Sequence, residues 1–150
     1  MINPAEISTL EFHESFEGRE FCADFTLTEA KLDQFIGATG DSSPLHVSDI
    51  FARNRGFAGR VVHGAYLTSL ATSVVGTRFP GQNALIHSVQ FRFHEPAYIG
   101  QSIQVRLTIE QASEAVKVIV VRAEIFHGET LCANGKIQVG FTHGQGKEIA

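Results

Sequence analysis

The segment from Gly40 to Gly64 holds the residues whose types and spacing are best suited to chemistry. It reads GDSSPLHVSDIFARNRGFAGRVVHG and places an acid, Asp41, shortly ahead of a histidine, His46. Histidine titrates near neutral pH without perturbation, and an aspartate can take or return a proton if its pKa is raised. This pair therefore predicts proton transfer at neutral pH.

A proline between the acid and the histidine restricts the backbone there. Pro44 fixes its own φ and biases Ser43 toward extended geometry, so we expect a stiff loop over 41–46 rather than a helix. Such a loop can hold the carboxylate and the imidazole a few Å apart. The segment closes at Gly64, where an apolar helix is predicted to begin, and the free N–H groups of its first turn could hold a developing oxyanion.

The same segment resembles the signature of the MaoC-like dehydratases, the (R)-specific enoyl-CoA hydratases of the hotdog fold. The likeness extends from about Thr28 to Phe141. It implies an α+β hotdog fold, in which a curved antiparallel sheet of about five strands wraps around a long buried helix. The residues that match the signature are Gly40-Asp41, Pro44-Leu45-His46, Phe51-Ala52, Gly59 and Val62-His63-Gly64.

The resemblance also implies an activity, namely reversible hydration of trans-2-enoyl thioesters to (R)-3-hydroxyacyl thioesters. The enzyme would be a lyase, and its substrate would hang from CoA or from an acyl carrier protein. Carried over from the family, Asp41 and His46 hold the water that adds to the β-carbon and return the proton to the α-carbon. The N–H of Gly64 is the candidate donor to the thioester carbonyl. Protomers of this family pair edge to edge, which implies a homodimer or a higher homo-oligomer.

Two further residues of the family pattern have alternative interpretations. His63 could take part in the chemistry, or it could be a structural histidine that bonds loop backbone. Thr72 lies two helical turns beyond Gly64, where some family members carry a hydroxyl that steadies the acid. It could orient Asp41, or it could bond back to a carbonyl of its own helix.

Two other functions remain open on the sequence. A hotdog thioesterase would use a carboxylate to activate water against the thioester carbonyl. The histidine downstream of the acid disfavours a thioesterase, because hydrolysis needs no proton returned to the α-carbon. A non-catalytic acyl-binding or assembly subunit would keep the scaffold without turnover. The intact pair of Asp41 and His46 disfavours that reading.

Metal and nucleotide cofactors have no sequence motif here. The seven histidines and two cysteines include no H-x-x-x-H or C-x-x-C spacing, and no G-x-G-x-x-G follows a predicted strand. We therefore expect no metal and no cofactor. Three basic residues, Arg92, Arg106 and Lys136, alternate outward on predicted strands, as either a solvated face or a contact for a CoA or carrier-protein phosphate.

The composition is that of one ordinary globular domain over 1–150, with 43% hydrophobic and 19% charged residues. A net charge of −4 without a Lys/Arg cluster excludes nucleic acid as an expected partner. Cys22 and Cys132 are expected to be buried thiols in a reducing compartment. No secretory signal or membrane-spanning run is expected, which favours a cytoplasmic location.

The periodicity of apolar residues predicts the elements that must position the site. A first strand is expected over 21–27, followed by a short helix that Thr28 caps and Gly37 and Gly40 end. A further helical turn or two is expected over 47–53. Flexible ends are expected at 1–19 and 142–150. The remaining chain alternates with period two, which predicts antiparallel strands joined by hairpin-length links over 85–94, 102–110, 115–126 and 131–141.

The helix predicted over 64–79 is apolar on one face and carries small residues on the other. A helix without a charged face is usually buried on all sides, and small residues let neighbouring backbone come close. Asn134-Gly135 is a hairpin signal that competes with one continuous last strand. Because the alternation runs through this dipeptide, a single strand over 131–141 is predicted.

Overall fold

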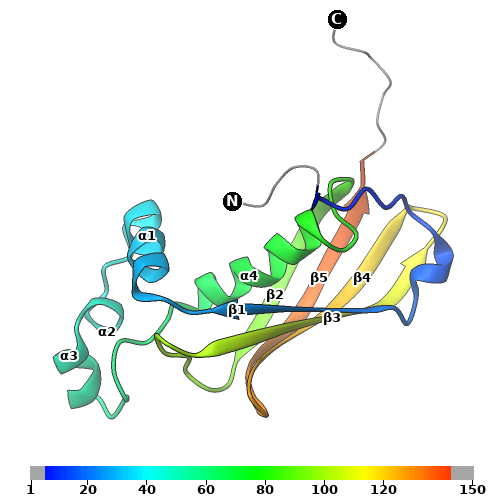
Figure 1. The fold of residues 1–150 in the computed structure, drawn as a ribbon. Coiled ribbons are helices and arrows are strands. Elements are labelled where there is room, and N and C mark those ends of the chain that lie inside the picture. The colour runs from blue at the N-terminus through cyan, green and yellow to red at the C-terminus, as the bar shows by residue number, and fades with distance from the viewer. Residues whose placement is uncertain (1–5, 143–150) are drawn as a thin grey trace, which may run out of the picture.

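The computed structural model describes residues 6–142 of the chain. Within them, the strands form one antiparallel sheet in the order β1-β3-β4-β5-β2. A long helix, α4 (Gly64–Thr77), lies along one face of this sheet, as Figure 1 shows. This is the predicted curved sheet on a long helix. The strands are β1 (Glu20–Thr26), β2 (Ala84–Phe93), β3 (Ser102–Ser113), β4 (Val118–His127) and β5 (Thr130–Phe141).

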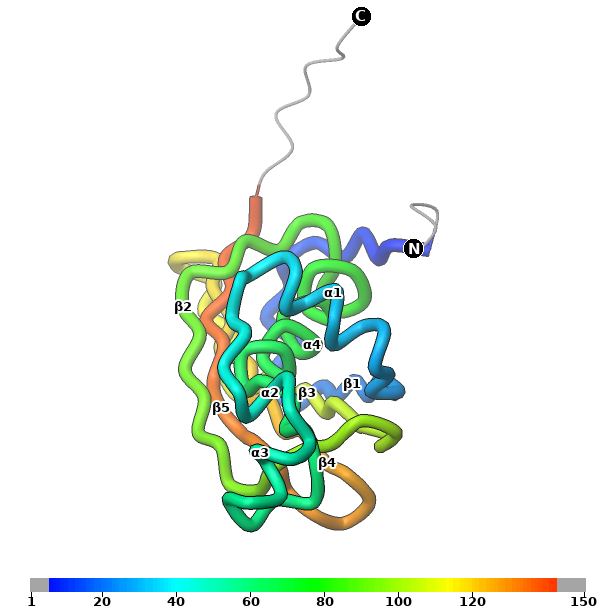
Figure 2. Tube along the Cα trace, turned by 90° about the vertical axis from the view of Figure 1, so that its left-hand side faces the viewer, coloured from blue at the N-terminus to red at the C-terminus, as the bar shows by residue number. Residues whose placement is uncertain are grey.

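Shorter helices gather at the end of the molecule where α4 begins. They are α1 (Glu29–Thr39), α2 (Pro44–Val47) and α3 (Asp49–Asn54), and Figure 2 shows them on the same side of the sheet as α4. The predicted cap of α1 is confirmed, since the Thr28 hydroxyl accepts the N–H of Lys31 at 3.2 Å. Gly40 ends this helix with a left-handed φ of 74°, whereas Gly37 remains inside it.

The core lies between the sheet and α4. Alternate residues of the central strands point inward and are fully buried, as their period of two predicted. They meet one stripe of α4, formed by Leu67, Leu70, Ala71, Val74 and Val75. The largest inward-facing side chains of the strands are Ile103, Val105, Leu107, Ile109, Ile119, Val121, Ile125, Ile137 and Val139.

The position of β2 differs from the expectation that consecutive strands are neighbours. The segment 94–101 does not close a hairpin, because β3 pairs with β1 and β4 while β2 pairs with β5 at the far edge. This segment instead passes the start of α4, where the N–H of Val62 bonds to the carbonyl of Ala97 at 2.8 Å. Strands β4 and β5 lie between β3 and β2 in the sheet, so the link has to cross from one side of the sheet to the other past the start of α4.

The last strand is continuous through Asn134-Gly135, as the alternation predicted. A Cβ at Gly135 would overlap the carbonyl oxygen of Gln90 and lie 2.8 Å from the ring of Phe91. Gly135 therefore allows β2 to lie close to β5, and it does not form a turn.

The segment expected to be an arm packs on the core instead, in the part of it that the structure describes, residues 6–19. The N–H of Ser8 donates to the carbonyl of Thr77 at 2.8 Å. Phe16, 4% exposed, packs against Phe79 and Phe141. The sequence pattern did not predict this packing, because a single buried aromatic residue leaves no periodic signal. Residues 1–5 and, of the expected tail 142–150, residues 143–150 lie outside the described part.

The prediction that α4 is buried on all sides is wrong for the single chain. The small-residue face opposite the core stripe stays open, with exposed side chains at Ala65, Ser69 and Ser73. Small residues satisfy the steric condition for close packing but do not supply a neighbour within the chain. None of the helices in residues 6–142 is long and apolar enough to cross a membrane.

Candidate active site

The histidine of the acid–histidine pair lies on a helix, which corrects the prediction of a loop over 41–46. Pro44 occupies the first position of α2, and His46 follows within the same turn. Proline is well suited to this position because its fixed φ fits a helix and its missing N–H would have no partner there. Ser43 is kept out of the helical region, with a ψ of 135°, as the residue before a proline should be.

The ring of His46 is oriented by backbone that precedes α4. Its Nδ1 lies 2.7 Å from the carbonyl oxygen of Val61, and the N–H of Val61 donates to the carbonyl of Leu45 at 3.1 Å. A carbonyl can only accept, so Nδ1 carries the proton in this bond. In a neutral ring, Nε2 is then the free acceptor.

The ring of His63 is buried directly beside the pair. It is 2% exposed and stacks on the ring of His46, with centroids 3.6 Å apart and an interplanar angle of 24°. Its Nε2 donates to the backbone carbonyl of Asp41 at 2.9 Å and lies 3.6 Å from that residue's carboxylate Oδ2. The ring of Phe35 packs against it at a centroid distance of 5.0 Å. This geometry is that of the structural alternative, in which His63 bonds loop backbone.

The carboxylate of Asp41 remains open to reactants. The side chain is 53% exposed. Its Oδ1 accepts the N–H of Ser43 at 3.3 Å, and the N–H of Asp41 donates to the hydroxyl of Thr39 at 3.2 Å. These local bonds and the one from His63 hold the Asp41 backbone against the start of α4, so the acid and the two histidines share one site.

An apolar cavity of about 410 Å³ opens beside His46 and Gly64. Gly64 is the first residue of α4, where N–H groups have no partner inside the helix. A side chain at this position would collide with a neighbour, because a Cβ there would lie 2.7 Å from the ring of Phe93. The apolar lining of the cavity comes from Phe57, Val61, Val62, Ala65, Leu67, Phe93, Pro96 and Ala97.

Two side chains of α4, those of Thr72 and Tyr66, make contacts that do not indicate a direct role in the reaction. Thr72 donates its hydroxyl hydrogen to the carbonyl of Ser69 at 3.1 Å, which is the second of its two predicted alternatives. No hydrogen bond joins Thr72 to Asp41 within residues 6–142. Tyr66 stacks on Phe35, with centroids 5.3 Å apart, and burial raises the pKa of its phenol.

Arg60 belongs to the site, although none of the sequence patterns above singled it out. Its guanidinium donates to the carbonyl of His46 and to carboxylates of Glu29 and Asp33. A sequence signal was present: Glu29 and Asp33 are acids four positions apart on α1, and neither has a basic partner within that helix.

The chemistry of the donor set disfavours a resident metal at this site. Ligand atoms of Asp41, His46 and His63 lie within 4.8 Å of one another. However, Nδ1 of His46 and Nε2 of His63 are already committed to backbone carbonyls. Nδ1 of His63 is buried without a partner among the described residues. Among the described residues, Nε2 of His46 is therefore the one open ring nitrogen beside the carboxylate of Asp41, and these two groups are fewer ligands than a resident metal usually has.

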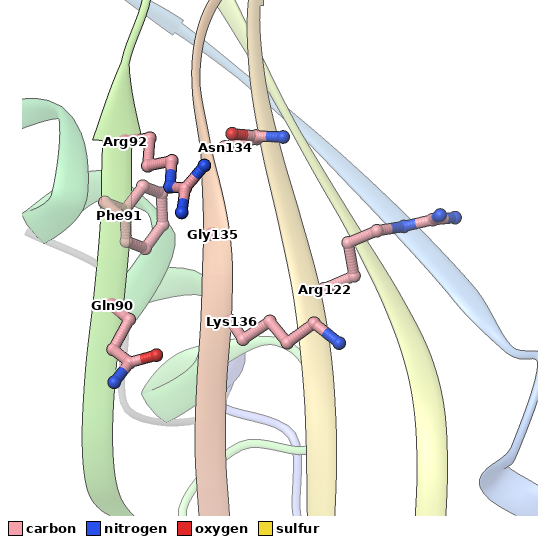
Figure 3. Close-up of a pocket in the computed structure, with 7 residues that line it drawn as sticks. All are labelled: Gln90, Phe91, Arg92, Arg122, Asn134, Gly135 and Lys136. Atoms are coloured by element: carbon pink, nitrogen blue, oxygen red, sulfur yellow. The ribbon is translucent and has the colours of Figure 1, made fainter.

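The outward-facing basic residues lie on the opposite face of the sheet from α4. Figure 3 shows Arg92, Arg122 and Lys136 beside one another on β2, β4 and β5, where they line a pocket of about 490 Å³. Lys136 pairs with Glu110 at 2.8 Å, and Arg122 lies 3.8 Å from the same acid. Arg106 stacks over the ring of Phe126 at 5.1 Å. In the described part of the chain Arg92 has no ion pair, so it is the residue of this group most available to an anion.

Comparison with known proteins places the chain in a family. Residues 14–129 match the family model described as MaoC like domain. The (R)-specific enoyl-CoA hydratase of Rhodospirillum rubrum is 27% identical over 111 residues, 74% of this chain and 77% of that protein. The 3-hydroxybutyryl-CoA dehydratase of Methylorubrum extorquens is 36% identical over 77 residues, 51% of this chain and 49% of that protein. This chain therefore matches only about half the length of the second relative.

A solved structure shares the fold. The (R)-hydratase from A. caviae involved in PHA biosynthesis superposes with a TM-score of 0.80 at 23% identity, covering 84% of this chain and 96% of that one. This likeness confirms the predicted hotdog fold. Because the family model covers most of the residues, the chain belongs to the MaoC like domain family.

Proposed function

We propose that the protein adds water reversibly to trans-2-enoyl thioesters and produces (R)-3-hydroxyacyl thioesters. One observation carries the proposal: the exposed carboxylate of Asp41 shares a site with His46, which keeps Nε2 free and lines an apolar cavity at the start of α4. The names of the relatives, an (R)-specific enoyl-CoA hydratase and a 3-hydroxybutyryl-CoA dehydratase, support the same reaction.

The proposed reaction uses Asp41 and His46 together. A water held between them loses a proton to this pair while its oxygen bonds to the β-carbon of the enoyl group. The pair then returns a proton to the α-carbon on the same face, so the enzyme ends in its starting state. The N–H of Gly64 donates to the thioester oxygen, which gains negative charge as the enolate forms. Dehydration runs through the same steps in reverse.

Hydrogen bonds around the pair support this assignment of roles. His63 fixes the backbone of Asp41, and Val61 fixes the ring of His46, so neither reacting group depends on the substrate for its position. Preorganised groups of this kind lower the barrier because they need little rearrangement when the transition state forms. We assign His63 a positioning role and leave the proton transfer to the exposed acid and the free ring nitrogen.

The substrate is proposed to place its acyl chain in the apolar cavity and its carrier outside. The lining of Phe57, Leu67 and Phe93 suits a hydrocarbon chain. CoA and an acyl carrier protein present the same thioester, and both remain candidates for the carrier. Cys22 and Cys132 are free thiols, which supports the cytoplasmic location expected from the sequence.

A homodimer is part of the proposal. Strand β2 forms an edge of the sheet, and its apolar side chains Leu85, Val89 and Phe93 are 54%, 37% and 54% exposed. The small-residue face of α4 is also uncovered in the single chain. A second copy that pairs along β2 would extend the sheet and remove these apolar side chains from water.

The proposal is tested by following the loss of enoyl-thioester absorbance with crotonyl-CoA and then with longer enoyl-CoAs. Chiral analysis of the product should show the (R)-3-hydroxyacyl thioester, because water held on one side of a planar enoyl group reaches only one face. A thiol assay run in parallel should detect no free CoA. Free CoA without hydroxyacyl product would establish a thioesterase instead, and an (S) product would overturn the proposed stereochemistry.

A further inference from the structure

We propose that Arg60 is a positioning residue for His46: its guanidinium joins α2 to α1 and thereby keeps the ring of His46 in one tautomer and orientation. The inference rests on the proposed function, because it assigns a task to the histidine of that site. Arg60 touches no reacting atom in this scheme. It acts through the backbone of His46.

The guanidinium of Arg60 makes contacts in three directions. Its Nε donates to the carbonyl oxygen of His46 at 2.7 Å. Nη1 donates to Oε1 of Glu29 at 3.1 Å and Nη2 to Oδ1 of Asp33 at 2.6 Å. The Arg60 side chain is 11% exposed, whereas those of Glu29 and Asp33 are 70% and 57% exposed. The cation is therefore enclosed between two helices, while its acidic partners face water.

This arrangement needs an arginine rather than any cation. The guanidinium holds its N–H groups in one rigid plane, so the bond to α2 and the bonds to α1 fix each other's geometry. A lysine has one flexible ammonium and cannot reproduce that plane. Ion pairs with exposed acids add little to folding stability. The contribution of Arg60 is thus expected in the geometry of the site more than in the stability of the fold.

The backbone beside Arg60 binds the ring of His46, whereas the Arg60 side chain binds the main-chain carbonyl of that residue. The N–H of Arg60 donates to Oδ1 of Asp49 at 2.9 Å, which anchors this stretch to α3. The next residue, Val61, accepts the Nδ1 proton of His46 at 2.7 Å. Arg60 and Val61 therefore hold the main-chain carbonyl and the ring of one histidine from opposite ends. Without the Arg60 side chain, α2 can tilt away from α1 and carry Nε2 away from the reacting position.

The test compares Arg60→Gln and Arg60→Lys with the wild-type protein. Arg53→Gln is the matched control, because Arg53 donates its Nε to the nearby carbonyl of Ala58 at 3.3 Å and, among residues 6–142, forms no side-chain hydrogen bond or ion pair with α1 or α2. Hydration of crotonyl-CoA gives kcat and KM, and ¹⁵N NMR of the imidazole reports the tautomer of His46. Thermal unfolding shows whether each variant is folded.

We expect kcat of Arg60→Gln to fall by about tenfold to a hundredfold, because small displacements of a reacting group have effects of this size. KM should stay within about twofold, since the acyl cavity is not touched. Arg60→Lys should recover part of the loss, and Arg53→Gln should match the wild type. The wild-type His46 should show the Nδ1–H tautomer, and Arg60→Gln should show an average of both tautomers.

A folded Arg60→Gln protein with wild-type kcat and a wild-type His46 spectrum would overturn the proposal. So would a lowered unfolding temperature with an unchanged tautomer, because that result describes a purely structural residue. If Arg60→Gln does not fold, the double variant Glu29→Ala/Asp33→Ala removes both acceptors on α1 and should also shift the tautomer. If the wild type hydrates no enoyl thioester, the proposed function fails, and the NMR comparison still decides whether Arg60 positions His46.

Discussion

Two histidines with stacked rings have different environments in this site, and the difference lies in their hydrogen bonds. His46 bonds a carbonyl through Nδ1 and keeps Nε2 free, whereas His63 uses Nε2 to hold the backbone of Asp41. A buried ring tied to backbone is a positioning group, and a ring with a free nitrogen beside a cavity can exchange protons. We therefore infer different roles for the two histidines from their individual hydrogen bonds, although both residues belong to the family pattern.

At this residue scale, Asp41→Asn is expected to keep the fold and lower hydration of crotonyl-CoA on the order of a hundredfold or more. The amide retains the shape of the half-exposed side chain but cannot accept a proton. Asp24→Asn, on exposed strand β1, is the control and should retain wild-type rates. Wild-type activity in a folded Asp41→Asn protein would end the catalytic assignment of this residue.

At the scale of elements, one predicted loop is in fact a helix, and one predicted strand runs through a dipeptide that could have made a hairpin. Pro44 begins α2 rather than stiffening a loop, and Gly135 admits the backbone of β2 rather than making a hairpin. Both residues have strong local preferences. Their neighbours decide which of the permitted conformations is used.

Gly135→Ala should consequently lower the free energy of unfolding by about 2 kcal/mol or more, because its Cβ would overlap the carbonyl of Gln90 and force β2 away from β5. Gly37→Ala is the matched control. A Cβ at Gly37 meets nothing within 4 Å in the interior of α1, so it should raise the free energy of unfolding by about 0.5 to 1 kcal/mol. Urea denaturation measures both, and equal effects of the two substitutions would contradict this account of β2 and β5.

The reactivity of the two cysteine thiols reports how well β1 and β5 protect them from solvent. Desolvation by burial, with a smaller contribution from the charge of Glu95, raises the pKa of the Cys132 thiol on β5, while Cys22 on β1 is exposed. At pH 8 a thiol reagent should therefore label Cys22 quickly and Cys132 only after unfolding. The raised pKa also means that this thiol stabilises the fold below its ordinary pKa, and that the contribution is lost as the pH rises through the folded-state value.

Single-cysteine variants separate the two signals. Cys22→Ser should abolish the fast labelling, and Cys132→Ser should leave it unchanged. Fast labelling that persists in Cys22→Ser would show that β5 opens readily in the folded protein.

For the whole molecule, the uncovered edge strand β2 and the open face of α4 are the surfaces on which the proposed dimer rests. Light scattering at micromolar concentration should report a particle of about twice the 16.4 kDa of one chain, or a multiple of that pair. Val89→Lys, on the apolar face of β2, should weaken the pair, because a buried charge without a partner is costly. Val116→Lys is the control, since Val116 is 66% exposed in the turn between β3 and β4. A monomer in the wild type would contradict the dimer.

The sequence by itself determined most of the strands, the helices α1 and α4 and the family signature of the site. Strand alternation, the Thr28 cap and the Gly40 stop act within a few residues, so they can be read without knowing the fold. Asp41, His46, His63 and Gly64 were found in the same way, as types at a fixed spacing. Their roles in catalysis stay predictions that the variants above test.

The tertiary structure alone decided how these parts meet. The placement of β2 beside β5, the packing of Phe16, the ring of Phe93 over Gly64 and the reach of Arg60 to α1 each join residues far apart in the chain. Such contacts depend on the path of the backbone around α4, which no local preference encodes. A hydrogen-bond partner is selected from whatever the fold brings within about 3 Å, and for that reason the free nitrogen of His46 could be identified only once the fold was known.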